Sequence, residues 1–161
     1  MTPEIFQIER ISAVYTVEAR KLYQTLVEEL YPAPEAREAF LQNWQAADFE
    51  SAQTSEDRPI FIALSPQKCV VGLLIGTGLE GGVGTIVWLG VARENRTMSL
   101  GRMLLDEAEG FYREIGGHKI KLFCNTESAK RFYERCGYTV EGWHPEHWWR
   151  MDCWSVGKSL V

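Results

Sequence analysis

One stretch of the chain, from Thr85 to Tyr138, predicts a strand, a loop, a helix, a second strand and a second helix, in that order. The first strand is apolar and rich in β-branched residues, which is typical of a strand buried on both faces. The first helix has apolar residues along one face and ends at Gly116-Gly117, where glycine accepts a left-handed conformation. The four elements are expected at residues 85–91, 100–115, 119–124 and 128–136. This order predicts a βαβ crossover, in which the loop after the first strand commonly binds the ligand.

That loop has the properties of an anion site. Ser99-Leu100-Gly101 opens the helix, where several backbone N–H groups have no partner within the helix. Those donors and the positive end of the helix dipole suit a phosphate or diphosphate. Arg96 and Arg102 flank the turn, and Gly101, which has no Cβ, allows a ligand to approach closely. The pattern leaves one alternative open, an ordinary loop with two solvated arginines.

Two motifs carry a resemblance to a known family. The segment from Val91 to Arg102 resembles the acyl-CoA loop of the GCN5-related N-acetyltransferases (GNAT), whose pattern is Arg/Gln-x-x-Gly-x-Gly/Ala. Arg96 and Gly101 match this pattern, and Ser99 stands where the first glycine is expected. Downstream, the chain is similar to the family's Asn…Ala…Tyr-Glu-x-x-Gly-Phe signature at Asn125, Ala129, Tyr133, Glu134, Gly137 and Tyr138. The motifs stand in the family's order, separated by a helix and a strand.

The resemblance implies an α/β (α+β) fold. In this acyl-CoA N-acyltransferase (GNAT) fold, a mixed, mostly antiparallel sheet of about seven strands is flanked by helices. The 161 residues, 45% apolar and 24% charged, fit one core, so we expect residues 1–161 to form a single N-acetyltransferase domain. Two further helices are expected at 17–30 and 35–49, and strands at 5–11, 59–64, 69–75, 138–143 and 148–154.

The resemblance also implies an activity. The chain would move an acetyl group from acetyl-CoA, its acyl-donor substrate, to a primary amine of a small molecule or peptide by direct attack. Pantetheine would pair with the first strand where it splays from its neighbour, and the N–H of Val91 would polarise the thioester carbonyl. Tyr133 would be the general acid, on one helical line with Ala129 and Asn125 at i, i+4 spacing. The implied acetyl-CoA-binding residues are Leu89, Val91, Arg96, Thr97, Met98, Ser99, Leu100, Gly101, Arg102, Asn125, Ser128 and Tyr133.

The general base is missing from the pattern. Many family members have a glutamate on the strand equivalent to residues 85–91, whereas this chain has Trp88 and no carboxylate there. A water relay is one alternative, and four side chains are candidates by type alone: Glu80, Glu94, His118 and Glu141. Covalent catalysis through Cys124 or Cys136 is disfavoured, because both lie in apolar segments where cysteine behaves as a small hydrophobic residue.

Two other classes of function are weighed against the enzyme. Ser99 in place of glycine and the absent strand carboxylate leave room for a non-catalytic CoA-binding sensor or partner-binding module on the same fold. The run Gly76-x-Gly78-x-x-Gly81 spells the dinucleotide-binding fingerprint of a nicotinamide-dependent oxidoreductase. That fingerprint requires a helix after its third glycine, but a strand-like β-branched segment follows here, so we expect a turn.

Composition narrows the partners. The net charge of −5 argues against nucleic acid, and the longest apolar runs are too short to cross a membrane. No signal peptide is visible and the four cysteines are separated, so we expect a cytoplasmic protein with reduced thiols. We expect no metal, with His144 and His147 facing solvent or the acceptor. The bend at residues 31–34 and the turn at 144–147 are the expected acceptor walls. The tryptophan-rich C-terminal end predicts core packing and cross-strand pairs, and leaves a homodimer contact open.

Overall fold

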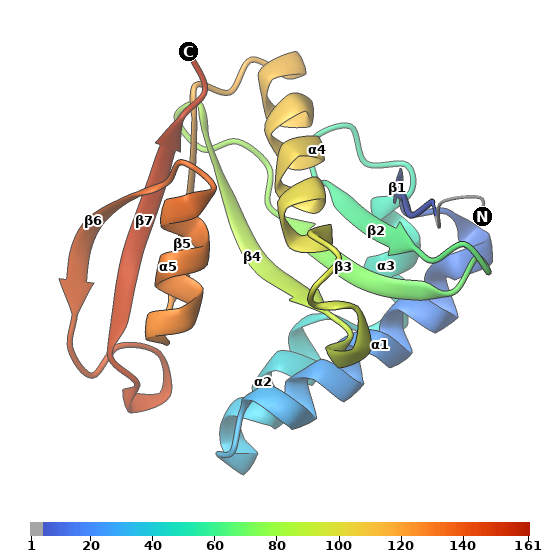
Figure 1. Cartoon of the computed structure of the whole chain (residues 1–161), viewed down its shortest axis with the longest axis horizontal. Coiled ribbons are helices and arrows are strands. Elements are labelled where there is room, and N and C mark those ends of the chain that lie inside the picture. The colour runs from blue at the N-terminus through green and yellow to red at the C-terminus, as the bar shows by residue number, and fades with distance from the viewer. Residues whose placement is uncertain (1–4) are drawn as a thin grey trace.

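A computed structural model describes residues 5–161 and shows an open, mixed, seven-stranded sheet with helices on both faces (Figure 1). The strand order is β1-β2-β3-β4-β5-β7-β6, and every neighbouring pair is antiparallel except β4 and β5. The predicted mixed, mostly antiparallel sheet and its βαβ crossover are therefore confirmed. The strands are β1 (Gln7–Arg10), β2 (Ile60–Leu64), β3 (Val70–Gly76), β4 (Val83–Val91), β5 (Lys119–Cys124), β6 (Thr139–His144) and β7 (Cys153–Ser159). The helices are α1 (Thr16–Leu30), α2 (Pro34–Asn43), α3 (Ala46–Ala52), α4 (Leu100–Glu114) and α5 (Glu127–Arg135).

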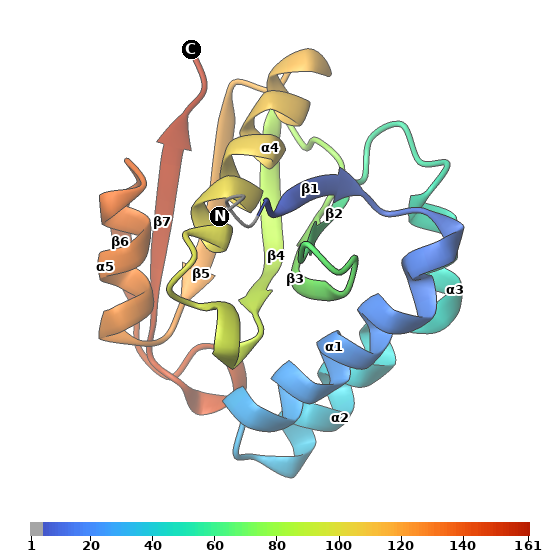
Figure 2. The same ribbon diagram turned by 45° about the vertical axis from the view of Figure 1, so that its right-hand side comes forward.

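The sheet separates two hydrophobic cores. Alternating residues of a strand point to opposite faces, so β2 directs Phe61 and Ala63 to the core that contains α4. Its other residues, with Tyr23 and Phe49, belong to the core that contains α1 and α3. The first three helices lie beside β2–β4, away from α5 and β6 (Figures 1 and 2). Because helices cover both faces, β2 is buried along its whole length.

The predicted helix over residues 35–49 is wrong in one respect, because it is two helices. The chain leaves helical geometry at Trp44, and Gln45 starts α3 with a capping box in which its backbone N–H donates to Asp48 Oδ2 at 2.7 Å. The predicted strand over residues 148–154 is also wrong. Residues 148–150 form a 3₁₀ turn, and β7 begins only at Cys153.

The path of β4 decides where a ligand can bind. Ile75 of β3 pairs with Trp88 and Gly76 pairs with Ile86, so Val87 is an extra residue, a β-bulge. On its other edge β4 pairs with β5 only over residues 83–85, and the two strands diverge toward their carboxyl ends (Figure 1). The expectation that this strand is buried on both faces is wrong at Val87, which is 39% exposed beside the divergence.

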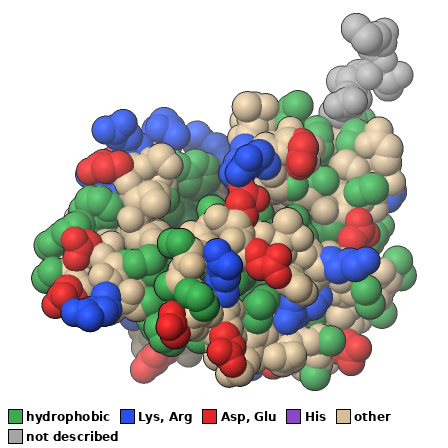
Figure 3. Space-filling model, turned by 90° about the horizontal axis from the view of Figure 1, so that it is seen from below, with side chains coloured by type: hydrophobic (Ala, Val, Ile, Leu, Met, Phe, Trp, Pro, Cys, Tyr) green, Lys and Arg blue, Asp and Glu red, His purple; other side chains and the backbone are tan. Residues whose placement is uncertain are grey.

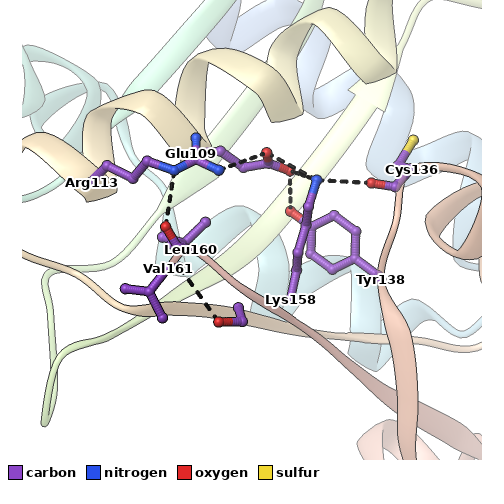
Figure 4. Close-up of polar contacts among 8 residues, drawn as sticks. Glu109, Arg113, Cys136, Tyr138, Lys158, Leu160 and Val161 are labelled. Carbon is purple, nitrogen blue, oxygen red and sulfur yellow. Dashed lines mark hydrogen bonds and ion pairs between the residues drawn. The ribbon is translucent and has the colours of Figure 1, made fainter.

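A buried ion pair ties α4 to the C-terminal half of the sheet (Figure 4). Glu109 of α4 is 4% exposed, and its Oε1 accepts hydrogen bonds from Lys158 Nζ at 2.9 Å and from the Tyr138 hydroxyl at 3.2 Å. Lys158 Nζ also donates to the carbonyl of Cys136 at 3.0 Å. These bonds link α4, the end of α5 and β7, so the elements beyond the divergence are fixed relative to α4.

Within residues 5–161, no helix combines the length and the apolar character that crossing a bilayer requires. The face seen from below mixes Lys and Arg with Asp, Glu and hydrophobic side chains (Figure 3). The Asp and Glu side chains behind the net charge of −5 are therefore not gathered into one acidic patch on this face.

Candidate functional site

Beyond residue 85, one edge of β4 has no strand beside it. The N–H of Ala92 donates to the carbonyl of Val71 in β3 at 2.8 Å. Successive residues of a strand direct their backbone groups to opposite edges, so the N–H groups of Val91 and Leu89 face the edge away from β3. Since β5 pairs with β4 no further than Thr85, that edge offers free backbone groups to an extended ligand.

The open edge of β4 leads to the uncapped start of α4. Ser99 is the N-cap residue, and no side chain accepts from the first N–H groups of the helix. Ser99 has φ 57°, a left-handed conformation that glycine adopts freely and that costs another residue about 1 kcal/mol. The serine thus keeps the backbone shape that the family pattern obtains with glycine. The orphan N–H groups at Leu100 and Gly101 suit an anion.

The loop arginines make an ion pair that the sequence did not reveal. Arg96 donates from Nε to the carbonyl of Val91 and from Nη2 to Glu29 Oε1, both at 3.0 Å. Arg93 Nη2 lies 3.1 Å from the same oxygen. Partial burial raises the pKa of Glu29 and the hydrogen bonds from Arg93 and Arg96 lower it, and the hydrogen bonds prevail. The C-terminal turn of α1 therefore holds the loop. Three other residues predicted to bind the diphosphate are solvent-exposed at the same place: Thr97, Met98 and Arg102.

Gly101 has a packing role in addition to the predicted one. A Cβ at this position would lie 2.9 Å from Cζ of Phe132, so the missing side chain allows α5 to pack against the start of α4. Ser128, which also belongs to α5, is exposed. The loop and α5, which carry the two sequence motifs, are therefore in direct contact.

The prediction that Asn125, Ala129 and Tyr133 lie along one line of a helix is wrong for Asn125. Helix α5 starts at Glu127, and its N-cap is Thr126, whose hydroxyl accepts from the N–H of Ala129 at 3.1 Å. Asn125 precedes the helix and donates from Nδ2 to the sulfur of Met151 at 3.0 Å. Its side chain therefore does not lie on the face of α5. It lines the cavity between β4 and β5 instead.

Tyr133 is 7% exposed and lies on α5 among aromatic rings. Its ring centroid is 5.1 Å from that of Phe132 and 5.8 Å from that of Tyr138. Burial raises the pKa of the Tyr133 hydroxyl far above its ordinary value, and the thiols of Cys124 and Cys136 add to the shift. The hydroxyl thus stays protonated and can act as a hydrogen-bond donor over the whole physiological range.

A cavity of about 340 Å³ opens between the diverging strands. Thr85, Ile86 and Val87 form the β4 wall, and residues of β5 with Asn125 form the other. Tyr31 lines it, as expected of the bend after α1. None of residues 144–147, the other expected wall, lines this cavity, and the 3₁₀ turn that follows contributes Trp148 instead. The sequence did not indicate the contribution of α2. The remaining lining residues are Phe40 and Asn43 of α2, the adjacent Trp44, Lys121, Phe123 and Cys124 of β5, and Trp148, Met151 and Cys153.

The two histidines of the turn do not line this cavity. The ring centroids of His144 and His147 lie 5.3 and 4.9 Å from that of Phe123. Among residues 5–161, no group of three or more His, Cys, Asp or Glu side chains is placed to hold a metal ion. The four cysteines are free thiols.

None of the predicted candidates for the base lines the cavity. Glu141 is paired with Lys119, and the other three lie outside the α-helices and the seven strands: Glu80, Glu94 and His118. Trp88, which replaces the strand glutamate of many family members, is 6% exposed and packs edge-on against Tyr23 at 5.0 Å. Its side chain joins the core with α1 and carries no proton acceptor.

The sequence matches the acetyltransferase (GNAT) family over residues 17–138. No curated protein sequence gives a significant match. Among solved structures, a GNAT-family acetyltransferase from Desulfovibrio desulfuricans has a TM-score of 0.78 at 17% identity, covering 98% of this chain and 100% of its own. A spermidine N-acetyltransferase SpeG chimera from Vibrio cholerae and hSSAT has a TM-score of 0.75 at 18% identity, covering 96% and 95%. An aminoglycoside 6′-N-acetyltransferase complexed with coenzyme A has a TM-score of 0.73 at 17% identity, covering 96% and 97%.

At these identities the solved structures establish the fold alone, and they confirm the acyltransferase fold that the two motifs predict. The family match is independent of them and spans most of the sequence, including both motifs. This chain belongs to the acetyltransferase (GNAT) family.

Proposed function

We propose that this protein transfers an acetyl group from acetyl-CoA to a primary amine of a small molecule or peptide by direct attack. The observation that carries the proposal is the free edge of β4 at Leu89 and Val91, which ends at the uncapped start of α4. Pantetheine would pair with that edge, and its diphosphate would accept from the N–H groups between Ser99 and Arg102. The thioester would then face the cavity between β4 and β5.

The residues present supply two of the three groups that the chemistry needs. The N–H of Val91 would donate to the thioester oxygen as it gains charge. Tyr133 would donate a hydrogen bond to the departing sulfur. Full proton transfer to a free thiolate is uphill, because even an unperturbed tyrosine has a pKa of about 10 against about 8.5 for a thiol. Burial of Tyr133 widens this gap, so hydrogen bonding to the developing charge is the role we assign to it.

The third group, a base, would be water. In the part of the chain that the structure describes, no carboxylate or histidine lines the cavity, so the proton of the attacking amine would leave through solvent. In the transfer, the amine nitrogen forms a bond to the acetyl carbon and the carbon–sulfur bond breaks. The released thiolate takes a proton, which leaves free CoA.

Two single proline substitutions test the role of the free edge of β4. In Val91→Pro the lost N–H is one that makes no bond to β3, so we expect the protein to fold and kcat to fall about 10²-fold or more. The matched control, Ala92→Pro, removes the N–H that donates to Val71, so we expect it to lower the melting temperature. Unchanged turnover in a folded Val91→Pro variant would contradict the proposed role of this edge.

An assay of acetyl transfer also distinguishes an enzyme from a CoA-binding sensor. Release of free thiol from acetyl-CoA in the presence of amines supports the enzyme. Stabilisation by CoA against heat without turnover on any amine would support the sensor. The cytoplasmic location and the homodimer remain predictions from the sequence.

A further inference from the structure

We propose that the amine acceptor has an aromatic or other apolar body and carries an anionic group, such as a carboxylate, that pairs with Lys121. This inference rests on the proposed function, because it takes the cavity between β4 and β5 as the acceptor site. It goes further by choosing one chemical class among the amines.

The walls of the cavity are mostly apolar, and five of the fourteen lining residues are aromatic. Tyr31 and Phe40 stack at 4.4 Å between ring centroids on the side of α1 and α2, next to Trp44. Phe123 of β5 and Trp148 of the 3₁₀ turn after β6 also line the cavity. Cavities for small ligands range from about 300 to 1,000 Å³, so about 340 Å³ suits a compact molecule. These walls favour a flat or branched apolar body over a long polar chain.

Among residues 5–161, Lys121 is the only charged side chain that lines the cavity. Lys119 points to the same face of β5 and is paired with Glu141, whereas within residues 5–161 Lys121 has no ion-pair partner. Asp152, which lies between the lining residues Met151 and Cys153, accepts a hydrogen bond from the N–H of Glu146 at 2.9 Å. Asp48 borders a separate hollow and accepts from Gln45. The cavity is therefore electropositive, with a free ammonium group for an anion.

This charge pattern differs from what polycationic acceptors require. Spermidine and aminoglycosides are named in two of the similar structures, and each carries several ammonium groups. An ammonium group in this cavity would meet Lys121 and no carboxylate, and like charges disfavour each other. An apolar amine with one carboxylate would instead neutralise Lys121.

The same pattern compensates for the missing base. Aromatic walls desolvate the amine, and this effect favours the neutral amine over the ammonium form. An amine that enters neutral can attack without a carboxylate in the wall, and its proton leaves to water afterwards. The absence of a glutamate at Trp88 thus fits an acceptor of this class.

A matched set of amines tests the inference through the specificity constant, kcat/KM. Phenylalanine and 2-phenylethylamine differ only in the carboxylate, and spermidine represents the polycations. We expect phenylalanine to exceed 2-phenylethylamine by about tenfold or more, as for one ion pair in a partly desolvated site. Lys121→Met should bring this ratio close to one, and Lys121→Glu should invert it. A preference of the unaltered protein for spermidine, or an unchanged ratio in Lys121→Met, would overturn the inference.

Calorimetry on the CoA-loaded protein separates this inference from the proposed function. Binding of phenylalanine that weakens in Lys121→Met supports the acceptor class even when no acetyl transfer follows, and in that case only the activity fails. Turnover on spermidine alone keeps the activity and overturns the acceptor class. If phenylalanine neither binds nor is acetylated, the acceptor class is also overturned.

Discussion

Thr85 and Lys121 form the last paired position between the parallel strands β4 and β5. Beyond this pair the two strands no longer pair with each other, although β4 stays paired with β3 and β5 with β7, so β4 presents free backbone groups on one edge and both strands border the cavity. The bulge at Val87 lies two residues further along β4, where it increases the bend. The donor edge and the acceptor cavity therefore share one structural cause, and the two substrates would meet where the strands separate.

The first prediction concerns Tyr133. We expect Tyr133→Phe to lower kcat roughly 10²-fold or more and to leave the affinity for acetyl-CoA unchanged, because only the hydrogen bond to the departing sulfur is lost. Steady-state kinetics and calorimetry with CoA measure the two quantities. Tyr138→Phe is the control, since its hydroxyl donates to Glu109 in the buried cluster and its loss should lower stability by about 1 kcal/mol. Equal turnover of Tyr133→Phe and the unaltered protein would remove Tyr133 from the mechanism.

The second prediction concerns Cys124, which lines the cavity together with Cys153. Burial raises the pKa of the Cys124 thiol to about 11, and the neighbouring Cys153 adds to the shift. At pH 7 the reactive thiolate is then about 1 part in 10⁴, and it increases tenfold with each pH unit up to the pKa. We expect alkylation of Cys124 by iodoacetamide to follow this slope, while the exposed Cys69 reacts readily at pH 7. We also expect no acetylated cysteine after incubation with acetyl-CoA alone, and a mass spectrum showing acetyl-Cys124 would indicate a covalent route.

The sequence predicts best those elements whose pattern is local. The alternating run over residues 119–124 coincides with β5, and the β-branched segment after the glycine run is indeed a strand and not a helix. The helical period of residues 35–49 continues through Trp44, so periodicity alone could not show the break there. The capping pattern of Gln45 and Asp48 was a local signal for the second helix, and only that signal could have corrected the prediction.

The residues of the candidate site also differ in how far a local sequence pattern could identify them. Sequence motifs identify the loop at Arg96–Arg102 and Tyr133, because the family pattern lies within short segments. Glu29 could not be identified, since it lies 67 positions from Arg96 and no local pattern links an exposed helix residue to a distant loop. The aromatic wall from α2 likewise depends on how the helix packs across β4. The expected cross-strand pairing of tryptophans does occur, between Trp143 and Trp154 at 4.8 Å.

The third prediction concerns Glu29. This carboxylate holds Arg93 and Arg96 and places a negative charge beside the proposed diphosphate site. Glu29→Gln keeps the size and an acceptor oxygen but removes the charge, so we expect CoA to bind about two- to fivefold more tightly at low ionic strength. Calorimetry at low and at high salt measures the effect, which screening should diminish. Weaker binding by the variant at both salt concentrations would instead mean that Glu29 is needed to position the arginines.

The fourth prediction uses two glycines of α4 as a matched pair. A Cβ at Gly110 would meet no atom within 4 Å, so Gly110→Ala should raise the free energy of unfolding by up to about 1 kcal/mol through helix propensity alone. A Cβ at Gly101 would lie 2.9 Å from the Phe132 ring, so in Gly101→Ala the ring must move, and α5 no longer packs as closely on the loop. We therefore expect Gly101→Ala to forfeit the propensity gain and to weaken CoA binding, as measured by denaturant unfolding and calorimetry. Equal stabilisation by both substitutions, with unchanged CoA affinity, would show that the contact between Gly101 and Phe132 does not shape the loop.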